Sequence, residues 1–317
     1  ACGFLGSWFV AVFDYLNLNV FDKHCTVYAV DSFISADKLN SIVKIQGEHI
    51  KFMKQDISTF QIDGVVDYII HAAGIASPIY YRRYPIETID GMGLGLRNIL
   101  NFAIKNAPLK SILNFSSSEI YGNPLPEYVP TSETYYGNVS PNGPRSCYDE
   151  SKRMGEAMCA SYHRIHNIPV KTVRPFNVYG PGMRVGDDRV VPKFTFQILK
   201  DEPITVHKPG IQTRTLCYIT DAITGFLKVL LNGTDGEVYN IGCISPELSM
   251  EQLAEKMIGM FNQGKIITID MPTEYPQDQA QRRCPDIAKA REELAYHPKI
   301  GLEQGLQQIY AWAKEQI

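Results

Sequence analysis

Two segments near the middle of the chain constrain the fold most strongly. The apolar run at 111–115 leads into three serines and Glu119, as the carboxyl end of a buried strand does. Tyr148 then opens a segment in which apolar residues recur at helical spacing, so a helix is expected over 148–167. Residues four apart share one face of a helix, so Tyr148 and Lys152 are expected to point the same way.

This pair of residues favours acid–base chemistry at an alcohol. A free tyrosine has a pKa of about 10 and is a poor base at neutral pH. A neighbouring ammonium stabilises the phenolate, so Lys152 is expected to lower the pKa of Tyr148. The hydroxyl of Ser117 is expected to share the same substrate oxygen. A tyrosine and a lysine at this spacing are also common on ordinary helices, so the assignment depends on the nucleotide-site features that accompany them.

The first residues carry part of a dinucleotide-binding fingerprint. Gly3 and Gly6 match the last two glycines of G-x-x-G-x-x-G, which follows a strand and opens a helix. The first glycine and its strand do not precede them, so we expect that the natural chain begins earlier. Backbone N–H groups of Gly3, Phe4, Leu5 and Gly6 are expected to face a pyrophosphate. A plain tight turn is the alternative.

Two further strand ends complete the predicted cofactor site. A run at 26–30 ends in Asp31, about 25 residues after the second glycine, near the spacing of the acid that binds the adenosine ribose. No arginine suited to a 2′-phosphate follows it, which favours NAD over NADP. The run at 65–70 is apolar apart from Asp67, as expected of a strand buried on both faces. The small residues Ala72 and Ala73 after it are expected to let a cofactor approach closely.

Strand-like runs alternate with helical segments along the chain. This order predicts an α/β fold with a Rossmann-type doubly wound parallel sheet. The periodicity changes after the strand at 170–173, and pieces suited to substrate binding dominate from there. We therefore expect an NAD-binding domain over 1–176 and a smaller C-terminal α/β domain over 177–317, mainly for substrate. A further strand is expected at 215–219, and Ser249 with Gln252 fits a capping box.

Composition argues against several other classes of protein. The 317 residues carry a net charge of −3, with no basic run suited to nucleic acid. No apolar stretch is long enough to cross a bilayer, and no secretory leader is evident. The seven cysteines are scattered and form no C-x-x-C pair, so neither a metal site nor a disulfide framework is expected. Reduced thiols in a cytoplasmic enzyme are the simplest interpretation.

The chain resembles the extended short-chain dehydrogenase/reductases that act on nucleotide sugars, and among them the UDP-glucuronate decarboxylases. The resemblance covers nearly the whole chain and is densest in the string YGNVSPNGPRSCYDESKR at 136–153. It implies NAD as cofactor and a nucleotide sugar, most simply a UDP-sugar, as substrate. It also implies a homodimer in which the helices at 86–107 and 148–167 pair across a two-fold axis.

The resemblance also assigns roles to single residues. Ser118 stands where similar 4,6-dehydratases carry an aspartate that protonates the departing C6 oxygen, and the pair Ser118–Glu119 is that of decarboxylases. Glu119 is expected to handle a proton or to orient the sugar, and Arg283 to act near C5 and C6. The other residues implied are Asp56 and Ile57 beside the adenine, Pro175 and Val178 over the nicotinamide, and Asn177 at the sugar diphosphate. Two positions depart from the family pattern: Met92 replaces an asparagine and Cys284 a lysine.

Further substrate contacts are expected from loops and from two arginines. A planar guanidinium suits a diphosphate, so Arg189 and Arg214 are candidate clamps, with solvated surface arginines as the alternative. The remaining candidates are Ser77, Tyr81, Val190 and Gln212. A 4,6-dehydratase, a 4-epimerase and a non-catalytic NAD-binding partner protein remain open beside the decarboxylase. The sequence leaves the identity of the nucleotide and the fate of the reduced cofactor undecided.

Overall fold

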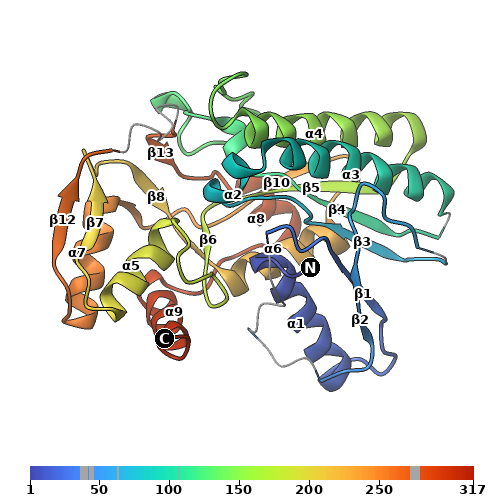
Figure 1. The fold of residues 1–317 in the computed structure, drawn as a ribbon. Helices are drawn as coiled ribbons and strands as arrows, with labels where there is room; N and C mark the ends of the chain where they lie inside the picture. The colour runs from blue at the N-terminus through green and yellow to red at the C-terminus, as the bar shows by residue number, and fades with distance from the viewer. Residues whose placement is uncertain (36–41, 43–45, 63, 107, 272–278) are drawn as a thin grey trace.

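The centre of the molecule is a four-stranded parallel sheet in the order β10-β5-β4-β3 (Figure 1). The structure, a computed structural model, describes residues 1–35, 42, 46–62, 64–106, 108–271 and 279–317. Ile112 of β4 pairs with Ile69 of β3 and with Val170 of β5. Because all three ladders are parallel, the carboxyl ends of the strands meet at one edge of the sheet. The four strands are β3 (Tyr68–His71), β4 (Ser111–Phe115), β5 (Val170–Pro175) and β10 (Val238–Ile241).

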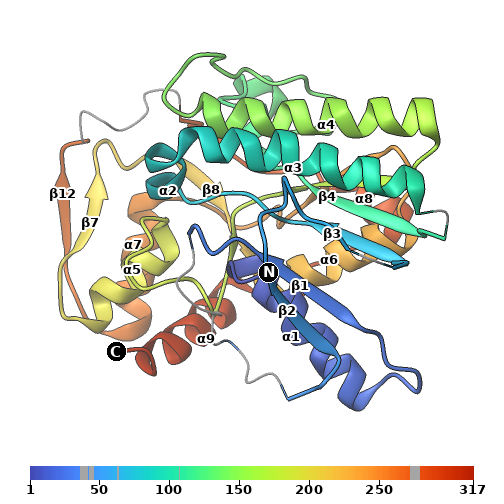
Figure 2. The same ribbon diagram turned by 45° about the vertical axis from the view of Figure 1, so that its right-hand side comes forward.

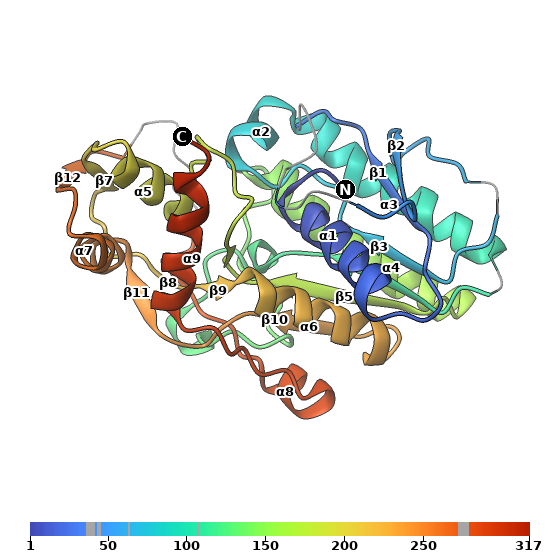
Figure 3. The same cartoon turned by 90° about the horizontal axis from the view of Figure 1, so that it is seen from below.

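Helices cover both faces of this sheet. In Figures 1 and 3, α3 (Pro85–Lys105) and α4 (Ser146–His166) lie together on one face, and α6 (Ile219–Asn232) and α8 (Ala288–Leu294) lie on the other. Every residue of β4 is buried, as expected of a central strand with both faces covered. The arrangement confirms the predicted α/β architecture. Among the described helices, none combines the length and the apolar character that a membrane crossing requires.

Two more strands form a separate parallel pair. β1 (Val27–Asp31) pairs with β2 (Ile50–Lys54), and the pair lies on the β3 side of the central sheet (Figure 2). Within the described ranges, neither β1 nor β2 is hydrogen-bonded to β3, the edge strand of the central sheet. α1 (Phe4–Asn19) packs between β1 and α6. The parallel sheet therefore consists of two pieces.

The remaining elements build the part of the molecule at the left of Figure 1. Its parallel pairs are β7 (Ile204–His207) with β12 (Ile266–Ile269), and β6 (Val178–Tyr179) with β9 (Cys217–Tyr218). β8 (Thr213–Thr215) lies between β11 (Glu247–Ser249) and β13 (Arg282–Arg283). The helices are α5 (Val190–Leu199), α7 (Met250–Phe261) and α9 (Leu302–Lys314). Three short helices, α2 (Pro78–Arg83), η1 (Ser118–Tyr121) and η2 (Pro126–Tyr128), belong to loops near the central sheet.

One hydrophobic core extends through both parts of the chain. It joins Phe9 of α1, Val173 of β5, Phe226 of α6 and Ile309 of α9. β10 and α6 return to the central sheet although they follow residue 176. The division into domains at 176 and 177 remains a prediction.

The secondary structure differs from the sequence expectations in a few places. The strand predicted at 215–219 is confirmed only in part, because Thr215 ends β8, Cys217–Tyr218 form the separate strand β9, and α6 already begins at Ile219. The apolar run at 65–70 becomes a strand only from Tyr68. The predicted helices agree with α3 and α4 within two residues at each end. The capping box of Ser249 and Gln252 is confirmed.

Two adjacent leucines of α6 test the burial pattern. Leu230 is 2% exposed and belongs to the shared core, so Leu230→Ala should lower the free energy of unfolding by about 2–5 kcal/mol. Leu231 is 58% exposed, so Leu231→Ala should change it by less than about 0.5 kcal/mol. Urea denaturation of both variants measures the difference. Equal losses would contradict the packing of α6 described here.

Candidate active site

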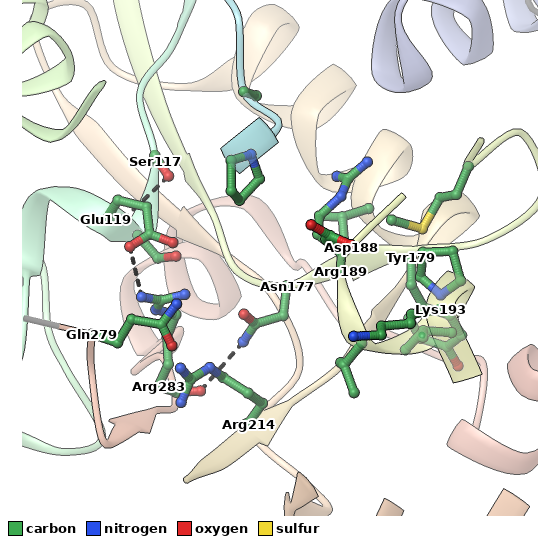
Figure 4. Close-up of a pocket in the computed structure, with 18 of the residues that line it drawn as sticks. Ser117, Glu119, Asn177, Tyr179, Asp188, Arg189, Lys193, Arg214, Gln279 and Arg283 are labelled. Carbon is green, nitrogen blue, oxygen red and sulfur yellow. Dashed lines mark hydrogen bonds and ion pairs between the residues drawn. The ribbon is translucent and has the colours of Figure 1, made fainter. Parts of the chain in front are cut away.

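A cavity of about 710 Å³ lies at the carboxyl ends of β4 and β5, between the central sheet and the C-terminal part (Figure 4). Ligands of open parallel sheets bind at this edge of the strands. Most of the predicted site residues line it. They are Phe4, Leu5, Ala72, Tyr81, Ser117, Ser118, Glu119, Tyr148, Lys152, Pro175, Asn177, Val178, Arg189, Val190, Gln212, Arg214 and Arg283.

Part of the predicted dinucleotide site lies beside the cavity without lining it. Gly3 is the N-cap of α1, and Gly6 lies in its first turn. A Cβ at Gly6 would come 2.7 Å from the carbonyl oxygen of Ala1, so this close approach requires glycine. The Asp31 carboxylate accepts hydrogen bonds from the backbone N–H of Cys2 at 2.7 Å and of Phe33 at 2.8 Å. Contacts of these residues with a cofactor stay predictions.

Four other predicted residues also lie outside the lining. The Asp56 carboxylate accepts from the Ser58 backbone N–H at 2.8 Å. Ile57 packs against α3, where its Cγ2 would be 2.4 Å from a Cβ placed on Gly95. Ala73 lies in the loop after β3, and Ser77 is the N-cap of α2. The cavity reaches their neighbours Ala72 and Pro78 instead.

Tyr148 and Lys152 lie side by side at the start of α4, as the helical spacing predicted. The ring of Tyr148 stacks on that of Tyr81, with centroids 5.3 Å apart and planes 18° apart. Lys152 Nζ lies 5.7 Å from the centroid of the Tyr148 ring and donates to the carbonyl oxygen of Phe115 at 2.5 Å. Both side chains are buried, so their orientation is fixed by contacts on all sides.

The prediction that Lys152 lowers the pKa of Tyr148 is wrong for this structure. Burial raises the pKa of Tyr148 to about 12, and a hydrogen bond with Ser117 opposes the shift only in part. Burial also lowers the pKa of Lys152 to about 8. The helical spacing placed the two groups together correctly, but it carries no information about desolvation, which dominates here.

Four charged side chains form a continuous series of ion pairs, Arg283–Glu119–Arg145–Asp149, in which Arg145 and Asp149 are buried and the side chains of Glu119 and Arg283 are 17% and 11% exposed. Glu119 Oε2 accepts from Arg283 Nη2 at 2.6 Å and also from Arg145 Nη2. Arg145 Nε lies 3.3 Å from Asp149 Oδ2. Figure 4 shows Glu119 and Arg283 pointing toward each other in the lining of the cavity. These ion pairs connect β13, η1 and the start of α4, and positive and negative side chains alternate along the series.

The pKa values of the two carboxyl groups in this series are shifted in opposite directions. Burial alone would raise the pKa of Glu119, but the guanidinium groups of Arg145 and Arg283 outweigh it and lower the pKa. Glu119 is therefore ionised at neutral pH. Burial, reinforced by the negative charge of Glu119, raises the pKa of Asp149 to about 7, against the pull of Arg145.

Arg145 is the main site residue that the sequence reasoning missed. It lies within the motif at 136–153, and it lines the cavity, but no role was assigned to it. Its spacing of three residues from Tyr148 places both on one face of a helix start, which is a usable signal. Other polar lining residues without an assigned role include Asp188, Lys193 and Gln279.

Further positive side chains line the cavity, two of them on or beside α5 and one on β8 next to Arg283. Arg189 Nε donates to Asp187 Oδ1 at 2.9 Å, which orients its guanidinium, and Lys193 lies one turn further along α5. Arg214 Nη1 donates to the carbonyl oxygen of Thr213 at 2.8 Å. Fixed guanidinium and ammonium groups around one cavity suit a diphosphate.

Asn177 links three segments at the floor of the cavity. Its Nδ2 donates to the carbonyl oxygen of Thr215 at 2.8 Å and lies 3.4 Å from that of Arg283. Its φ of 44° is left-handed, a conformation that asparagine tolerates better than most residues. Asn177 thus ties the end of β5 to β8 and β13.

The two departures from the resembled family are both buried. Met92 is 3% exposed and packs with Ile75, Tyr81 and Tyr148. Cys284 follows Arg283 and donates its thiol to the carbonyl oxygen of Ile244 at 3.6 Å. Both side chains serve as packing groups in this chain.

The wall near α1 fits a dinucleotide. The first N–H groups of a helix have no intrahelical partner, and Gly3 offers α1 no side chain that could cap them, so these groups suit a pyrophosphate. Small residues, Ala72 and Gly74, line the same wall, and a Cβ at Gly74 would come 2.5 Å from Met92 Cε. The described residues contain no group of three or more histidine, cysteine, aspartate or glutamate side chains placed to hold a metal ion.

Two proteins of similar sequence are named as decarboxylases of UDP-glucuronic acid. UDP-glucuronic acid decarboxylase 3 of Arabidopsis thaliana is 41% identical over 305 residues, which cover 96% of this chain and 84% of that protein. UDP-glucuronic acid decarboxylase 1 of Xenopus tropicalis is 36% identical over 293 residues, with 92% and 67% covered. The resemblance stated from the sequence is confirmed.

Solved structures and a family model identify the wider group. The UDP-glucose 4-epimerase of Thermotoga maritima superposes with a TM-score of 0.84 at 24% identity, covering 99% of this chain and 97% of that one. The UDP-glucuronic acid 4-epimerase of Bacillus cereus, in complex with UDP-glucuronic acid and NAD, gives 0.81 at 24%, covering 100% and 98%. The predicted Rossmann-type fold and NAD cofactor are confirmed. Residues 1–242 match the family model, and the chain belongs to the NAD dependent epimerase/dehydratase family.

Proposed function

We propose that this protein is an NAD-dependent decarboxylase of UDP-glucuronate that works through a 4-keto intermediate. The observation that carries the proposal is the placement of Arg283. One of its nitrogens binds Glu119, while its buried Nε has no hydrogen-bond partner among the described residues. The Arg283 guanidinium lines the same cavity as Tyr148, and a planar charged donor suits the carboxylate of a uronic acid. The similarity to the Arabidopsis and Xenopus decarboxylases supports the same substrate.

The first step is oxidation of the sugar at C4. Tyr148 takes the proton of the C4 hydroxyl, and Ser117 donates a hydrogen bond to the same oxygen. When bound, NAD⁺ supplies the hydride acceptor and a positive charge that favours ionisation of Tyr148. Lys152 holds its ammonium beside the tyrosine ring. The product is a 4-ketone.

The second step is loss of the carboxylate, which is β to the new ketone. The C5–carboxyl bond breaks, CO₂ leaves, and its electron pair becomes an enolate with the charge on the C4 oxygen. Ser117 and Tyr148 donate hydrogen bonds to this developing oxyanion. C5 then takes up one proton. The enolate forms without an external acid at the departing group.

The dehydratase alternative needs an acid at the position that Ser118 occupies. Ser118 replaces the aspartate expected of such enzymes, and a serine hydroxyl is too weak an acid to protonate a leaving hydroxide. Glu119 is ionised, because two guanidinium groups lower its pKa. We therefore assign Glu119 to orienting the sugar and Arg283, rather than to donating a proton.

The substrate comparison tests the reaction type. With NAD⁺, UDP-glucuronate should release CO₂ and give a pentose nucleotide, while UDP-glucose should give no 4-keto-6-deoxy product. Trapped CO₂ and mass spectrometry of the nucleotides measure both. Tyr148→Phe, which lacks the phenolic oxygen, should be inactive toward both sugars.

Two results would reject the decarboxylase. A 4-keto-6-deoxy sugar from UDP-glucose with inert UDP-glucuronate would favour the dehydratase. Conversion of UDP-glucuronate to its C4 epimer without CO₂ would favour the 4-epimerase, for which the Bacillus cereus protein of similar fold is named.

Neighbouring arginines of β13 test the role assigned to Arg283. Arg283→Ala should lower kcat/KM for UDP-glucuronate by about a hundredfold or more, because it removes a charge-assisted contact to the carboxylate. Arg282 lies 2.8 Å from Glu247 and does not line the cavity, so Arg282→Ala should stay within a few-fold of the wild type. Steady-state kinetics compare the two. Similar losses of kcat/KM in both variants would contradict a carboxylate-binding role for Arg283 and indicate a structural role for β13.

We also propose a homodimer built on α3 and α4. Both helices expose apolar side chains on the outer face of the molecule, including Leu94, 54% exposed, and Met154, 42% exposed. Such a patch favours association. Light scattering at micromolar concentration should give twice the chain mass for the wild type and the single mass for Leu94→Arg. Leu231→Arg, on the opposite side of the sheet, should remain dimeric. A monomeric wild type contradicts the proposal.

The cellular location and the domain division remain proposals as well. All seven cysteines are free thiols, which supports a reducing compartment such as the cytoplasm. The change in character of the chain after residue 176 supports a C-terminal part devoted mainly to the nucleotide sugar, since Arg189, Gln212 and Arg214 all belong to it.

A further inference from the structure

Asp149 is a buried carboxyl group that the proposed mechanism does not use. It is 4% exposed and follows Tyr148 in α4. Oδ2 lies 3.3 Å from Arg145 Nε, whereas the buried Oδ1 has no hydrogen-bond partner among the described residues. A half-satisfied buried carboxylate is an unfavourable arrangement that needs an explanation.

The groups around Asp149 come from several elements. Arg145, Cys147 and Tyr148 belong to the start of its own helix. Glu119 approaches from η1, Tyr81 from α2 and Arg283 from β13. All of these act electrostatically on Asp149 or feel its charge. The acid thus lies at the end of the ion-pair series that begins at the proposed carboxylate-binding arginine.

When Asp149 is ionised, the four members of the ion-pair series carry no net charge, and Arg214 of β8 acts on Glu119 from outside the series. Two guanidinium groups, of Arg145 and Arg283, face two carboxylates, of Glu119 and Asp149. A uronate carboxylate placed against Arg283 adds a third negative charge. Excess buried charge is costly, and such a site commonly neutralises itself by binding a proton. A neutral hexose adds no such charge.

The two acids differ in how well they hold their charge. Glu119 accepts hydrogen bonds from two guanidinium groups at one oxygen. Asp149 has only the longer contact to Arg145, and its second oxygen has no partner among the residues that the structure describes. The proton therefore goes to Asp149.

We propose that Asp149 takes up a proton from solvent when a uronate carboxylate binds beside Arg283. The inference rests on the proposed function, because it needs a substrate with a carboxylate at C6. Asp149 is a positioning residue in this role, since it acts on the substrate through Arg145 and Glu119. No covalent bond other than the new O–H bond of Asp149 changes.

The pKa of Asp149, raised by burial to about 7, makes this exchange possible at neutral pH. Because the bound complex holds more protons than the free protein, uronate binding weakens as the pH rises through 7. Where Asp149 is fully ionised in the free protein, a complete proton uptake would weaken binding tenfold per pH unit. Binding of a neutral hexose nucleotide lacks this dependence.

Calorimetry in buffers of different ionisation enthalpy counts the protons. The protein is loaded with NADH, which cannot accept a hydride, and titrated with UDP-glucuronate or UDP-glucose. These ligands share the nucleotide and differ at C6. The uronate should take up about half a proton at pH 7 and close to one at pH 8, and the hexose none in excess.

Matched variants separate Asp149 from its surroundings. Asp149→Asn should abolish the excess uptake and flatten the pH dependence of uronate affinity. Glu150→Gln should keep both, because Glu150 is a partly exposed acid that pairs with Arg153 at 3.6 Å. Asp149→Asn should unfold at no lower temperature at pH 8, since the folded protein disfavours the ionised carboxyl there. If it does not fold, the comparison of the two sugars in the wild type decides alone.

The outcomes distinguish this inference from the proposed function. Equal proton uptake for both sugars, or excess uptake that persists in Asp149→Asn, overturns the role of Asp149. Release of CO₂ without excess uptake overturns this inference and leaves the decarboxylase standing. Excess proton uptake without release of CO₂ supports the role of Asp149 and rejects the decarboxylase. A protein that does not bind UDP-glucuronate rejects both.

Discussion

The pairing of Glu119 with two arginines is the interaction on which the site depends. Its members lie far apart in the sequence, on η1, at the start of α4 and on β13. Removing one partner of a buried ion pair costs about 3–5 kcal/mol, because the other charge is left unpaired. β13 is further held by its pairing with β8, in which Arg283 lies opposite Arg214. The C-terminal part is thus fixed over the sheet edge by charge as well as by apolar contact.

The same interaction decides which chemistry the cavity supports. An acid that is kept ionised cannot donate a proton to a departing hydroxide, whereas CO₂ leaves as a neutral molecule and requires none. Tyr148 stacks on Tyr81, and burial raises its pKa to about 12, so the phenol keeps its proton at neutral pH. A site of this kind favours loss of a carboxylate over loss of water, and the Arg283 guanidinium in the cavity lining favours a substrate that carries a carboxylate.

Local patterns in the sequence predicted the elements well and the electrostatics poorly. The face shared by Tyr148 and Lys152 follows from helical spacing alone, and both line the cavity. The partner of Lys152, the carbonyl oxygen of Phe115, is 37 residues away, and no local pattern indicates it. The pKa of Tyr148 was misjudged because burial is a property of the folded chain. The role of Arg145 depends on its ion pairs with Glu119 and Asp149, and the pair with Glu119 forms only in the folded chain.

The continuous core has a consequence for how the cavity opens. Phe9, Val173 and Ile309 belong to one apolar cluster, so the two sides of the cavity share their buried surface. A rigid-body hinge between them would expose that surface to water, at about 25 cal/mol for each Å². Admission of a nucleotide sugar therefore depends on rearrangement of segments at the rim. Thermal unfolding of the two sides is expected to be a single cooperative event, which any ligand of the cavity delays for the whole chain.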